Sequence, residues 1–426
     1  MGEIKTIKDL VDWRLCIGCG ACAYVCPEDK ISMIDVWGEG LRPTTSLEPC
    51  ETCQDCMNVC PSVDVDYRAI RENAKTSNNQ LEFPSDDEFG IASEWGPITG
   101  IWEGHATDEE IRFKGSSGGA LTAISLYCLE KEGMHGVLHI GQDNYNPILN
   151  KTRLSRSREQ LLASAGSRYS PASVCDRLDL VENAPSPCAI IGKPAEIVAT
   201  RKAAMLRPAL ASKLGVTLSF FCAETPSTSG TANLLEKHGV DFRELKSLKY
   251  RGNGWPGHFA PILKGNDQPA FQSTYRESWA QLQASRPWAT QIWPDGSGEL
   301  ADISCGDPWY IEPDGKNPGQ SLVIARTETG KRIVENAIRD GYLNLTPAEP
   351  WKITKSQEGL LAKKMAIWGR ILTMKLFGIP TPKHVGIDLL KLWLQLPLKQ
   401  LLSSTAGTAR RIVSRKLYKK RINESA

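Results

Sequence analysis

Two cysteine runs near the N-terminus constrain the fold of this chain more than any other feature of its sequence. The first, residues 16–27, reads CIGCGACAYVCP, and the second, residues 50–61, reads CETCQDCMNVCP. Both have the same two-two-three spacing between cysteines and the same proline after the last one. This spacing is typical of bacterial two-cluster ferredoxins, in which thiolates from both runs hold each 4Fe–4S cluster. The repeat therefore predicts an α+β ferredoxin-like domain with two clusters.

The last cysteine of each run is expected to serve the cluster of the other run, because this crossing is typical of two-cluster ferredoxins. The two predicted ligand sets are Cys16, Cys19, Cys22 and Cys60 for one cluster, and Cys50, Cys53, Cys56 and Cys26 for the other. The alternative is zinc, whose structural sites usually take four ligands as two separated pairs. Zinc does not need two complete runs that each end in proline, so the pattern favours iron–sulfur.

Cysteine usage and the first residues indicate the compartment. The opening stretch MGEIKTIKDLVDWRLC has no apolar h-region of the kind that a secretory signal needs. The chain also has no run of about 18 apolar residues, so we expect no membrane span. Thirteen cysteines would suit a secreted disulfide framework, but eight of them lie in the two runs. We therefore expect a reducing, cytoplasmic location.

The rest of the chain divides by its periodicity. Short apolar runs at 136–141, 188–194 and 216–224 predict buried strands, and the segments 119–133, 195–206 and 229–239 predict helices. Strands that alternate with helices predict an α/β domain with a largely parallel sheet. The expected division is a ferredoxin-like domain at 1–70, a linker at 71–95, an α/β domain at 96–350 and a helical basic tail at 351–426.

The segment FKGSSGGALTA, residues 113–123, places glycines and serines directly before a predicted helix. Backbone N–H groups at such a helix start suit a phosphate or pyrophosphate, although an ordinary helix cap has the same composition. The segment matches neither the P-loop nor GxGxxG, which argues against a nucleoside triphosphatase or a Rossmann site. The candidate cofactor-binding residues here are Lys114, Gly115, Ser116, Ser117, Gly118 and Gly119.

Three further loops carry candidate site residues, and each can also be read as an ordinary turn. They read SAGSRYSP at 164–171, YRGNGWPGHF at 250–259 and ADISCGDPW at 301–309. An arginine can pair with phosphate or stack on a ring, and glycines let a loop approach a flat ligand. The candidates are Ser167, Arg168, Tyr169 and Asn253 for cofactor binding, and Arg251, His258 and Asp307 for substrate polarisation, flavin contact or proton donation.

Taken in order, these motifs resemble the coenzyme F-420 hydrogenase/dehydrogenase beta-subunit family of iron–sulfur flavoproteins. The resemblance rests on FKGSSGG, AGSRYSP, IGKP, FFCAETPSTSGT, YRGNGWPG and ADISCGD, and runs from the cysteine repeats to about residue 310. It implies that the α/β domain binds FAD at the edge of its sheet, with residues 115–119 and 167–169 near the phosphates and ribityl chain. It also implies that electrons move between the clusters and the flavin.

The sequence departs from the family where many members carry additional cysteines. Members often have a cysteine after IGKP or IGTP and a CxxC pair before PDG, whereas this chain has Ala195, Thr290 and Trp293. These residues argue against another cluster inside the flavin domain. The remaining cysteines show no ligand spacing, and free cysteines are commonly buried structural residues. They are Cys128, Cys175, Cys188, Cys222 and Cys305.

The tail from residue 351 onward is strongly basic, with 16 Lys and Arg against 3 Asp and Glu. Apolar residues recur in it at helical spacing, which favours packing on the parent domain or on another subunit of an oligomer. A basic amphipathic helix with tryptophan could also lie on an anionic membrane surface, which would place the protein at the inner membrane face. Nucleic-acid binding is not expected, because no nucleic-acid-binding fold accompanies the charge.

The leading functional hypothesis is a flavin-dependent oxidoreductase with two 4Fe–4S clusters and FAD. Ferredoxin or another redox protein would exchange electrons with the clusters, and the flavin would act on a small organic substrate or coenzyme. The alternative is an electron-relay or scaffold subunit of a larger redox complex, with no substrate of its own. A third possibility is a peripheral membrane or interaction protein anchored by the tail.

Overall fold

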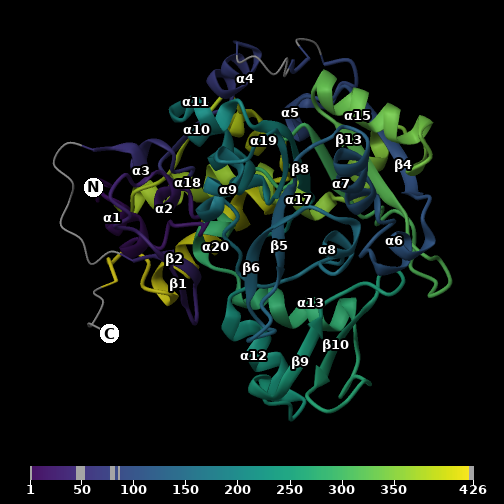
Figure 1. The fold of residues 1–426 in the computed structure, drawn as a ribbon. Helices are drawn as coiled ribbons and strands as arrows, with labels where there is room; N and C mark the ends of the chain where they lie inside the picture. The colour runs from purple at the N-terminus through teal and green to yellow at the C-terminus, as the bar shows by residue number, and fades with distance from the viewer. Residues whose placement is uncertain (1, 45–52, 77–81, 85–86, 422–426) are drawn as a thin grey trace.

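An eight-stranded mixed sheet forms the centre of the protein, seen here in a computed structural model that describes residues 2–44, 53–76, 82–84 and 87–421. The strand order is β14-β4-β13-β12-β8-β7-β5-β6 (Figure 1). The four central strands β12, β8, β7 and β5 run parallel, and the strands outside them pair antiparallel. The bounds are β4 Gly100–Ala106, β5 Val137–Gln142, β6 Asn150–Ser155, β7 Cys188–Gly192, β8 Leu214–Phe220, β12 Ile303–Gly306, β13 Ser321–Ala325 and β14 Leu343–Pro347.

The predicted α/β architecture is confirmed, and β5, β7 and β8 fall on the three expected apolar runs. The expectation of a largely parallel sheet holds only for the centre. The sheet is mixed because antiparallel strands extend it at both edges. β8 also ends at Phe220, four residues before the predicted end, and the residues after it form a loop that lines the site described below.

Helices cover both faces of this sheet because side chains alternate along each strand. Val137 belongs to the core on one face and the next residue, Leu138, to the core on the other. The first face is covered by α6 Glu109–Lys114, α7 Ala120–Glu130, α8 Arg158–Leu162 and α15 Glu328–Arg339. The second face is covered by α9 Asp179–Glu182, α10 Pro194–Leu206 and α11 Pro208–Ala211.

The ferredoxin-like part packs on the second face, through the same core that holds α10 and α11. Val25 of its helix α2 shares that core with Ile190 of β7 and Ala199 of α10. Figure 1 shows this part in purple beside the sheet domain. Its elements are α1 Ile7–Asp12, α2 Ala21–Val25, β1 Met33–Val36, β2 Gly40–Pro43, α3 Asp55–Asn58 and β3 Asp64–Asp66.

A smaller unit with its own core projects from the sheet domain at the bottom of Figure 1. It consists of a three-stranded sheet and two helices, and Tyr250, Phe259 and Leu282 are buried in it. Its last helix, α13, returns the chain to the main sheet. The bounds are α12 Thr228–Lys237, β9 Leu245–Lys249, β10 His258–Leu263, β11 Ser273–Thr274 and α13 Tyr275–Leu282.

The start of the expected linker is helical. Residues Tyr67–Thr76 form α4, in which Tyr67, Ile70 and Ala74 are buried against α10 and β3. These positions recur at the spacing of three to four residues that places side chains on one helix face. A short helix, α5 Ala92–Trp95, precedes the first strand of the sheet.

The tail runs back across the molecule and packs against the ferredoxin-like part. β15 pairs in parallel with β3, and Ile412 and Leu417 share a core with Leu10 of α1. The elements are α16 Trp351–Ser356, α17 Glu358–Met365, α18 Ile367–Leu376, β15 Lys383–Val385, α19 Leu389–Leu394 and α20 Leu398–Ser414. None of the helices in the described part of the chain has the length and apolar content that crossing a bilayer requires.

Candidate functional site

Four of the predicted cluster ligands surround one small cavity, here called the cluster cavity, with a volume of about 330 Å³. These are Cys16, Cys19, Cys22 and Cys60. Cys16 and Cys19 lie in the loop before α2, Cys22 lies in α2, and Cys60 comes from the second run. The structure thus brings cysteines of both runs to one place, and their assignment to one cluster stays a prediction. Four cysteine sulfurs around an enclosed, mostly apolar space fit a 4Fe–4S cluster.

The electrostatics of these thiols also favour a cluster. Burial, followed by the neighbouring cysteines, raises the pKa of Cys22 well above its usual value, and burial raises the pKa of Cys60 to about 12. A lone thiolate is therefore unfavourable in this cavity. Bound metal ions remove that cost because their positive charge stabilises deprotonated sulfur.

The second ligand set is only partly described. Cys26 follows α2, Cys53 precedes α3 and Cys56 lies in α3. The two helices lie next to each other, so these cysteines belong to adjoining elements. Cys50 lies outside the described residues, and the assignment of this second set stays a prediction.

A much larger cavity, here called the main cavity, opens at the carboxyl ends of the parallel strands. Its empty volume, with the open mouth included, is about 1630 Å³. Ile140 of β5, Ile191 of β7, Phe220 of β8 and Cys305 of β12 all contribute to its lining. Open α/β sheets bind ligands at this edge. The part of this space that can hold the centre of a water molecule is about 270 Å³. This is close to the lower end of the range for ordinary ligand pockets, about 300–1,000 Å³.

The glycine- and serine-rich loop before α7 forms one wall of the main cavity. Gly115, Ser116, Ser117 and Gly119 belong to the lining. Ser116 Oγ accepts a hydrogen bond from Ser167 N at 2.6 Å, so two of the predicted loops meet there. Gly118 lies outside the lining and packs against β4 instead. The approach is so close that a Cβ on Gly118 would come within 2.7 Å of the Gly104 carbonyl oxygen.

Arg251 and Asp307, predicted separately, form a bidentate ion pair in the wall of the main cavity. The Nη1–Oδ2 and Nη2–Oδ1 distances are 2.9 and 2.7 Å. Arg251 also donates through Nε to Pro256 O at 2.8 Å, and Trp255 Nε1 donates to Asp307 Oδ1 at 2.9 Å. Burial alone would lower the pKa of Arg251, but Asp307, Tyr169 and Tyr275 together outweigh it and raise that pKa. The guanidinium therefore stays charged, and the Asp307 carboxylate balances that charge at the cavity wall.

Four aromatic side chains gather around this arginine. Tyr275 and Trp309 are stacked with ring centroids 5.2 Å apart, and the Arg251 guanidinium lies 4.5 Å from the Tyr275 centroid. Tyr169 lies 5.0 Å from Trp279, measured between ring centroids. All four rings line the main cavity. Their faces suit a planar aromatic ligand.

Besides Gly118, three other predicted site residues lie outside the lining of the main cavity, which corrects the roles expected for them. Lys114 pairs with Glu110 of its own helix at 2.7 Å rather than facing a cofactor phosphate. Asn253 is exposed and accepts a hydrogen bond from Lys249 Nζ at 2.7 Å. His258 is exposed at the start of β10, so the structure does not support its expected role as a proton donor.

Arg168 lines the main cavity, but its guanidinium is hydrogen-bonded to other groups of the protein. It donates to the carbonyl oxygens of Pro147 at 2.6 Å and of Leu149 and Leu248 at 3.1 Å, and it also bonds the side chain of Asn150. These bonds tie its loop to β6 and to β9 of the smaller unit. The expected pairing of Arg168 with a cofactor phosphate is therefore corrected to a structural role.

Several lining residues were not predicted from the sequence as site residues. They are Lys193, Cys222, Glu224, Tyr275, Trp279 and the tail residues Gln357 and Leu360. The spacing of Tyr275 and Trp279 by four residues in one helix was a usable signal, because it places both rings on one face. The tail residues carried no such signal, since only the packing of α17 brings them to the cavity.

A third cavity, here called the junction cavity, joins the other two. At one end its lining includes Cys16, Ile17 and Gly18, which also line the cluster cavity. At the other end its lining includes Lys193 and Glu224, which also line the main cavity. The three cavities thus follow one another from the cluster cysteines to the main cavity, and each shares lining residues with the next.

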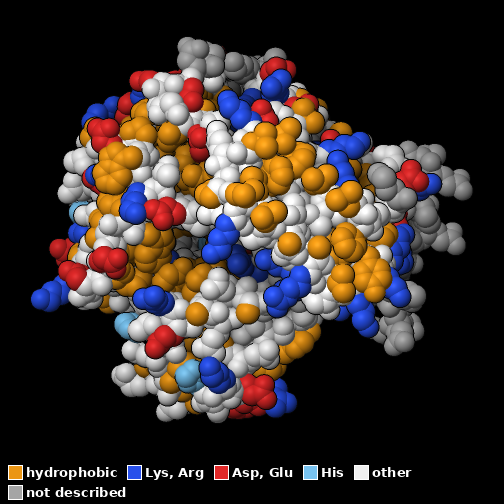
Figure 2. Space-filling model, turned by 180° about the vertical axis from the view of Figure 1, so that it is seen from behind, with side chains coloured by type: hydrophobic (Ala, Val, Ile, Leu, Met, Phe, Trp, Pro, Cys, Tyr) orange, Lys and Arg blue, Asp and Glu red, His pale blue; other side chains and the backbone are white. Residues whose placement is uncertain are grey.

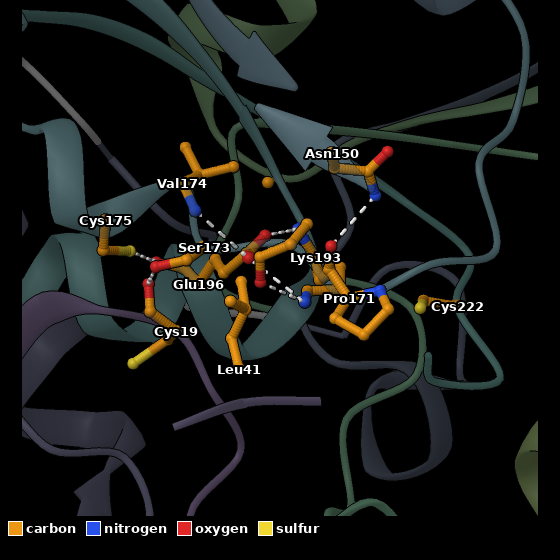
Figure 3. A network of polar contacts seen from close by, with 12 residues as sticks. Cys19, Leu41, Asn150, Pro171, Ser173, Val174, Cys175, Lys193, Glu196 and Cys222 are labelled. Atoms are coloured by element: carbon orange, nitrogen blue, oxygen red, sulfur yellow. Dashed lines mark hydrogen bonds and ion pairs between the residues drawn. The ribbon is translucent and has the colours of Figure 1, made fainter. Parts of the chain in front are cut away.

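A set of polar contacts also runs from a cysteine of the first run toward the main cavity (Figure 3). The carbonyl oxygen of Cys19 accepts from Cys175 N at 3.1 Å, and Cys175 Sγ donates to the Glu196 carbonyl at 3.3 Å. Lys193 Nζ lies 3.1 Å from the Glu196 carboxylate and donates to Ala172 O at 3.0 Å. A bonded path therefore connects a cluster cysteine with the wall of the main cavity.

Of the three positions that lack the family's additional cysteines, two belong to the packed interior and the third, Thr290, is buried at the edge of the junction cavity. Ala195 and Trp293 share a core with Ile197, and both are almost fully buried. Thr290 Oγ1 donates to Pro287 O at 2.7 Å within its own turn. These side chains fill space and satisfy local bonds, and none of the three is a typical ligand of an iron–sulfur cluster.

Fold and site together define an iron–sulfur protein in which a ferredoxin-type module is joined to an α/β ligand-binding domain. Sequence models of known families match the same parts. A 4Fe-4S dicluster domain matches residues 15–63, and the N-terminal and C-terminal domains of the coenzyme F420 hydrogenase/dehydrogenase beta subunit match 101–179 and 187–350. The chain belongs to the coenzyme F420 hydrogenase/dehydrogenase beta-subunit family.

Similar proteins come from methanogens. The coenzyme F420-dependent sulfite reductase of Methanocaldococcus jannaschii is 23% identical over 78% of this chain, which spans only 47% of that relative. The coenzyme F420 hydrogenase subunit beta of Methanothermobacter thermautotrophicus is 25% identical over 67% of this chain and 99% of its own length. A chain of the F420-reducing [NiFe] hydrogenase complex of Methanosarcina barkeri shares the fold, with a TM-score of 0.52, 22% identity, and 69% of this chain and 98% of that one covered.

Proposed function

We propose that this protein is an oxidoreductase that passes electrons between two 4Fe–4S clusters and FAD bound in the main cavity, and on to a small organic substrate or coenzyme. The observation that carries this proposal is the series of three cavities from Cys16 to the main cavity. In this proposal the cluster and the flavin would lie at the two ends of that series, with the junction cavity between them.

The lining of the main cavity has the two kinds of surface that FAD needs. The loop of Gly115, Ser116, Ser117 and Gly119 offers backbone N–H groups and the start of α7 to phosphates. The aromatic rings around Arg251 offer flat faces to a ring system. FAD would collect single electrons and transfer them as pairs.

Arg251 has a defined part in this proposal. Its ion pair with Asp307 holds the guanidinium in place beside the aromatic rings of the cavity wall. Folding sets this arrangement, so the groups need no reorganisation when electrons arrive.

The names of the relatives suggest a substrate class. They include F420 hydrogenase, F420-dependent formate dehydrogenase and F420-dependent sulfite reductase. A deazaflavin coenzyme is therefore one candidate for the small molecule that exchanges electrons in the main cavity. Ferredoxin or another redox protein in a reducing cytoplasm is the partner that we propose for the clusters.

A second candidate function is that of a relay or scaffold subunit in a larger redox complex. It is favoured by the relatives that are named as subunits and by the likeness to a chain of a hydrogenase complex. In that case turnover would require co-purified partner chains. Isolated protein that reduces an organic acceptor unaided would exclude this alternative.

Cofactor analysis of anaerobically purified protein tests the proposal. Two cubane clusters and one flavin correspond to about eight irons and one flavin per chain. A preparation that contains iron but binds no flavin, even after incubation with FAD, would remove the flavin part. A preparation without iron would remove the electron-transfer role altogether.

A further inference from the structure

Glu224 is held at the boundary between the junction cavity and the main cavity, in a backbone conformation that its residue type disfavours. Its φ of +78° lies in the left-handed region, which costs free energy for residues with a side chain. Neighbouring contacts fix the loop: Arg286 Nη1 donates to Ala223 O at 2.6 Å, and Glu224 N donates to Cys222 Sγ at 3.3 Å. The fold thus keeps a carboxyl group at this point despite the strain.

The carboxyl group of Glu224 is buried and incompletely bonded. The residue is 4% exposed, and within the described ranges Oε1 has no hydrogen-bond partner. The nearest opposite charge is Lys363 of α17, whose Nζ lies 3.7 Å from Oε1 and likewise has no hydrogen bond to a described residue. Burial raises the pKa of Glu224 and lowers that of Lys363. Both shifts favour the uncharged forms, with a proton on the carboxyl group.

The other ionisable groups that face Glu224 have partners of their own. Lys193 at the start of α10 is paired with Glu196, and Asp295 accepts backbone N–H bonds from the residues that follow it. Arg286 is bonded to backbone carbonyl oxygens, and Cys222 lies on the same loop as Glu224. In the described structure, Glu224 and Lys363 are therefore the groups at this boundary that are free to exchange a proton.

We propose that Glu224 and Lys363 form a proton-delivery pair for reductions in the main cavity. The proposal rests on the proposed function, because it requires an organic acceptor A that takes up two electrons there. The balance is A + 2e⁻ + 2H⁺ → AH₂. Each electron comes from a reduced 4Fe–4S cluster, which is oxidised in the step and reduced again by a one-electron donor protein.

Each proton leaves the Glu224 carboxyl group as its O–H bond breaks. Lys363, uncharged in the resting pair, takes up a proton from water, which leaves hydroxide, and passes that proton to the resulting Glu224 carboxylate, which restores both uncharged groups. Lys363 is the more exposed of the two, with 11% of its side chain exposed against 3% for Glu224, although Nζ itself is enclosed. Lys363 thus lies on the solvent side of the pair, and Glu224 lies at the boundary between the junction cavity and the main cavity.

The test compares full-length, cluster-loaded protein in four forms. These are the wild type, Glu224→Gln, Lys363→Met and, as control, Glu358→Gln, which changes an exposed carboxyl group on the same helix as Lys363. Glu224→Asn is a second variant in case Glu224→Gln does not fold, because asparagine tolerates a left-handed backbone. Infrared spectroscopy at neutral pH is the first readout and needs no cofactor in the main cavity. We expect the band of a protonated carboxyl group in the wild type and in Glu358→Gln, and its loss in Glu224→Gln.

The second readout is the rate at which reduced clusters pass electrons to bound flavin, measured against pH in H₂O and D₂O. We expect the wild-type rate to fall as pH rises through the raised pKa of Glu224, with a solvent isotope effect. Glu224→Gln should lose at least about tenfold in rate, together with the pH dependence and the isotope effect. Lys363→Met should slow repeated turnover, and Glu358→Gln should match the wild type.

An unchanged rate, pH profile and isotope effect in Glu224→Gln would overturn the proposal, as would a wild-type spectrum without the carboxyl band. Failure of the proposed function gives a different result. Protein that binds no flavin would refute the flavin role, while the infrared comparison would still decide whether Glu224 holds a proton.

Discussion

At the scale of single residues, the Arg251–Asp307 pair is the contact on which the wall of the main cavity depends. Replacing Arg251 by methionine leaves Asp307 partly buried without its cation. Breaking a buried pair in this way costs about 3–5 kcal/mol. We therefore expect Arg251→Met to lower the free energy of unfolding by that amount in denaturant titrations. Arg243→Met, which removes an exposed pair with Asp241, is the control and should leave the midpoint unchanged. Equal midpoints for both variants would contradict this account.

His384 of β15 makes the junction between the tail and the ferredoxin-like part sensitive to acid. Both of its ring nitrogens are enclosed and lack hydrogen-bond partners among the described residues, and burial lowers its pKa to about 4. An unfolded histidine titrates near about 6.5. Between these two values the unfolded chain binds more protons, so the stability falls as the pH drops through this window.

The prediction for His384 is that His384→Leu makes thermal unfolding less dependent on pH between about 6.5 and about 4, because the substitution removes this proton uptake. Melting temperatures of the two proteins, measured across that range, check it. Parallel curves would show that His384 is not the responsible group.

Cys60 tests the crossed ligand arrangement. If it completes the cluster of the first run, Cys60→Ala should reduce the iron content from about eight to about four per chain. Cys128→Ala, which changes a buried cysteine in the core of the sheet domain, should keep all the iron. Full iron content in Cys60→Ala would assign this cysteine elsewhere.

Single site residues were predictable from the sequence where the chemistry is local. The cysteine spacing pointed to four residues that line one cavity, although their assignment to one cluster stays a prediction. The two loops contained Arg251 and Asp307 but did not show that these residues pair. The roles of Arg168, Lys114 and Asn253 could not be predicted, because they depend on which acceptors the fold brings near each side chain. Glu224 was missed for a related reason: its partner Lys363 lies in a tail that has no visible connection to the sheet.

At the scale of elements, α19 and α20 carry an apolar stripe that the fold leaves uncovered. Four leucines spaced four residues apart are between 42% and 70% exposed: Leu390, Leu394, Leu398 and Leu402. Figure 2, which views the molecule from behind, shows apolar side chains beside Lys and Arg on this face. Such a combination suits the surface of an anionic membrane.

The stripe leads to a binding prediction. We expect the protein to sediment with vesicles that contain anionic lipid, and less with neutral vesicles or at high salt. Leu394→Glu combined with Leu398→Glu should reduce this binding at least about tenfold, while Glu358→Gln should not. Equal sedimentation with all vesicles and variants would leave the stripe without a membrane role.

The order of elements in the sheet domain was largely predictable, because strand and helix periodicities differ and the central strands are apolar throughout. The pairing of β15 with β3 was not. It joins residues more than 300 positions apart in the sequence, and the short strands carry no signal of their partner. The first part of the linker was also misread, since three buried positions in α4 make only a short periodic pattern.

At the scale of the whole molecule, the tail connects the sheet domain with the ferredoxin-like part. It leaves the sheet domain, contributes Gln357 and Leu360 to the main cavity, and then packs on the ferredoxin-like part. This arrangement holds the cluster cavity, the junction cavity and the main cavity in a fixed series. Electron transfer between fixed centres requires such rigidity, because its rate falls steeply with separation.

The central claim is that electrons reach the main cavity through the clusters, and anaerobic stopped-flow spectroscopy tests it most directly. Flavin-loaded protein is mixed with reduced ferredoxin while cluster and flavin absorbance are followed together. We predict that the clusters are reduced first and the flavin second, and that Cys60→Ala slows the second phase. Flavin reduction that precedes cluster reduction, or that is as fast in Cys60→Ala as in the wild type, would contradict the account.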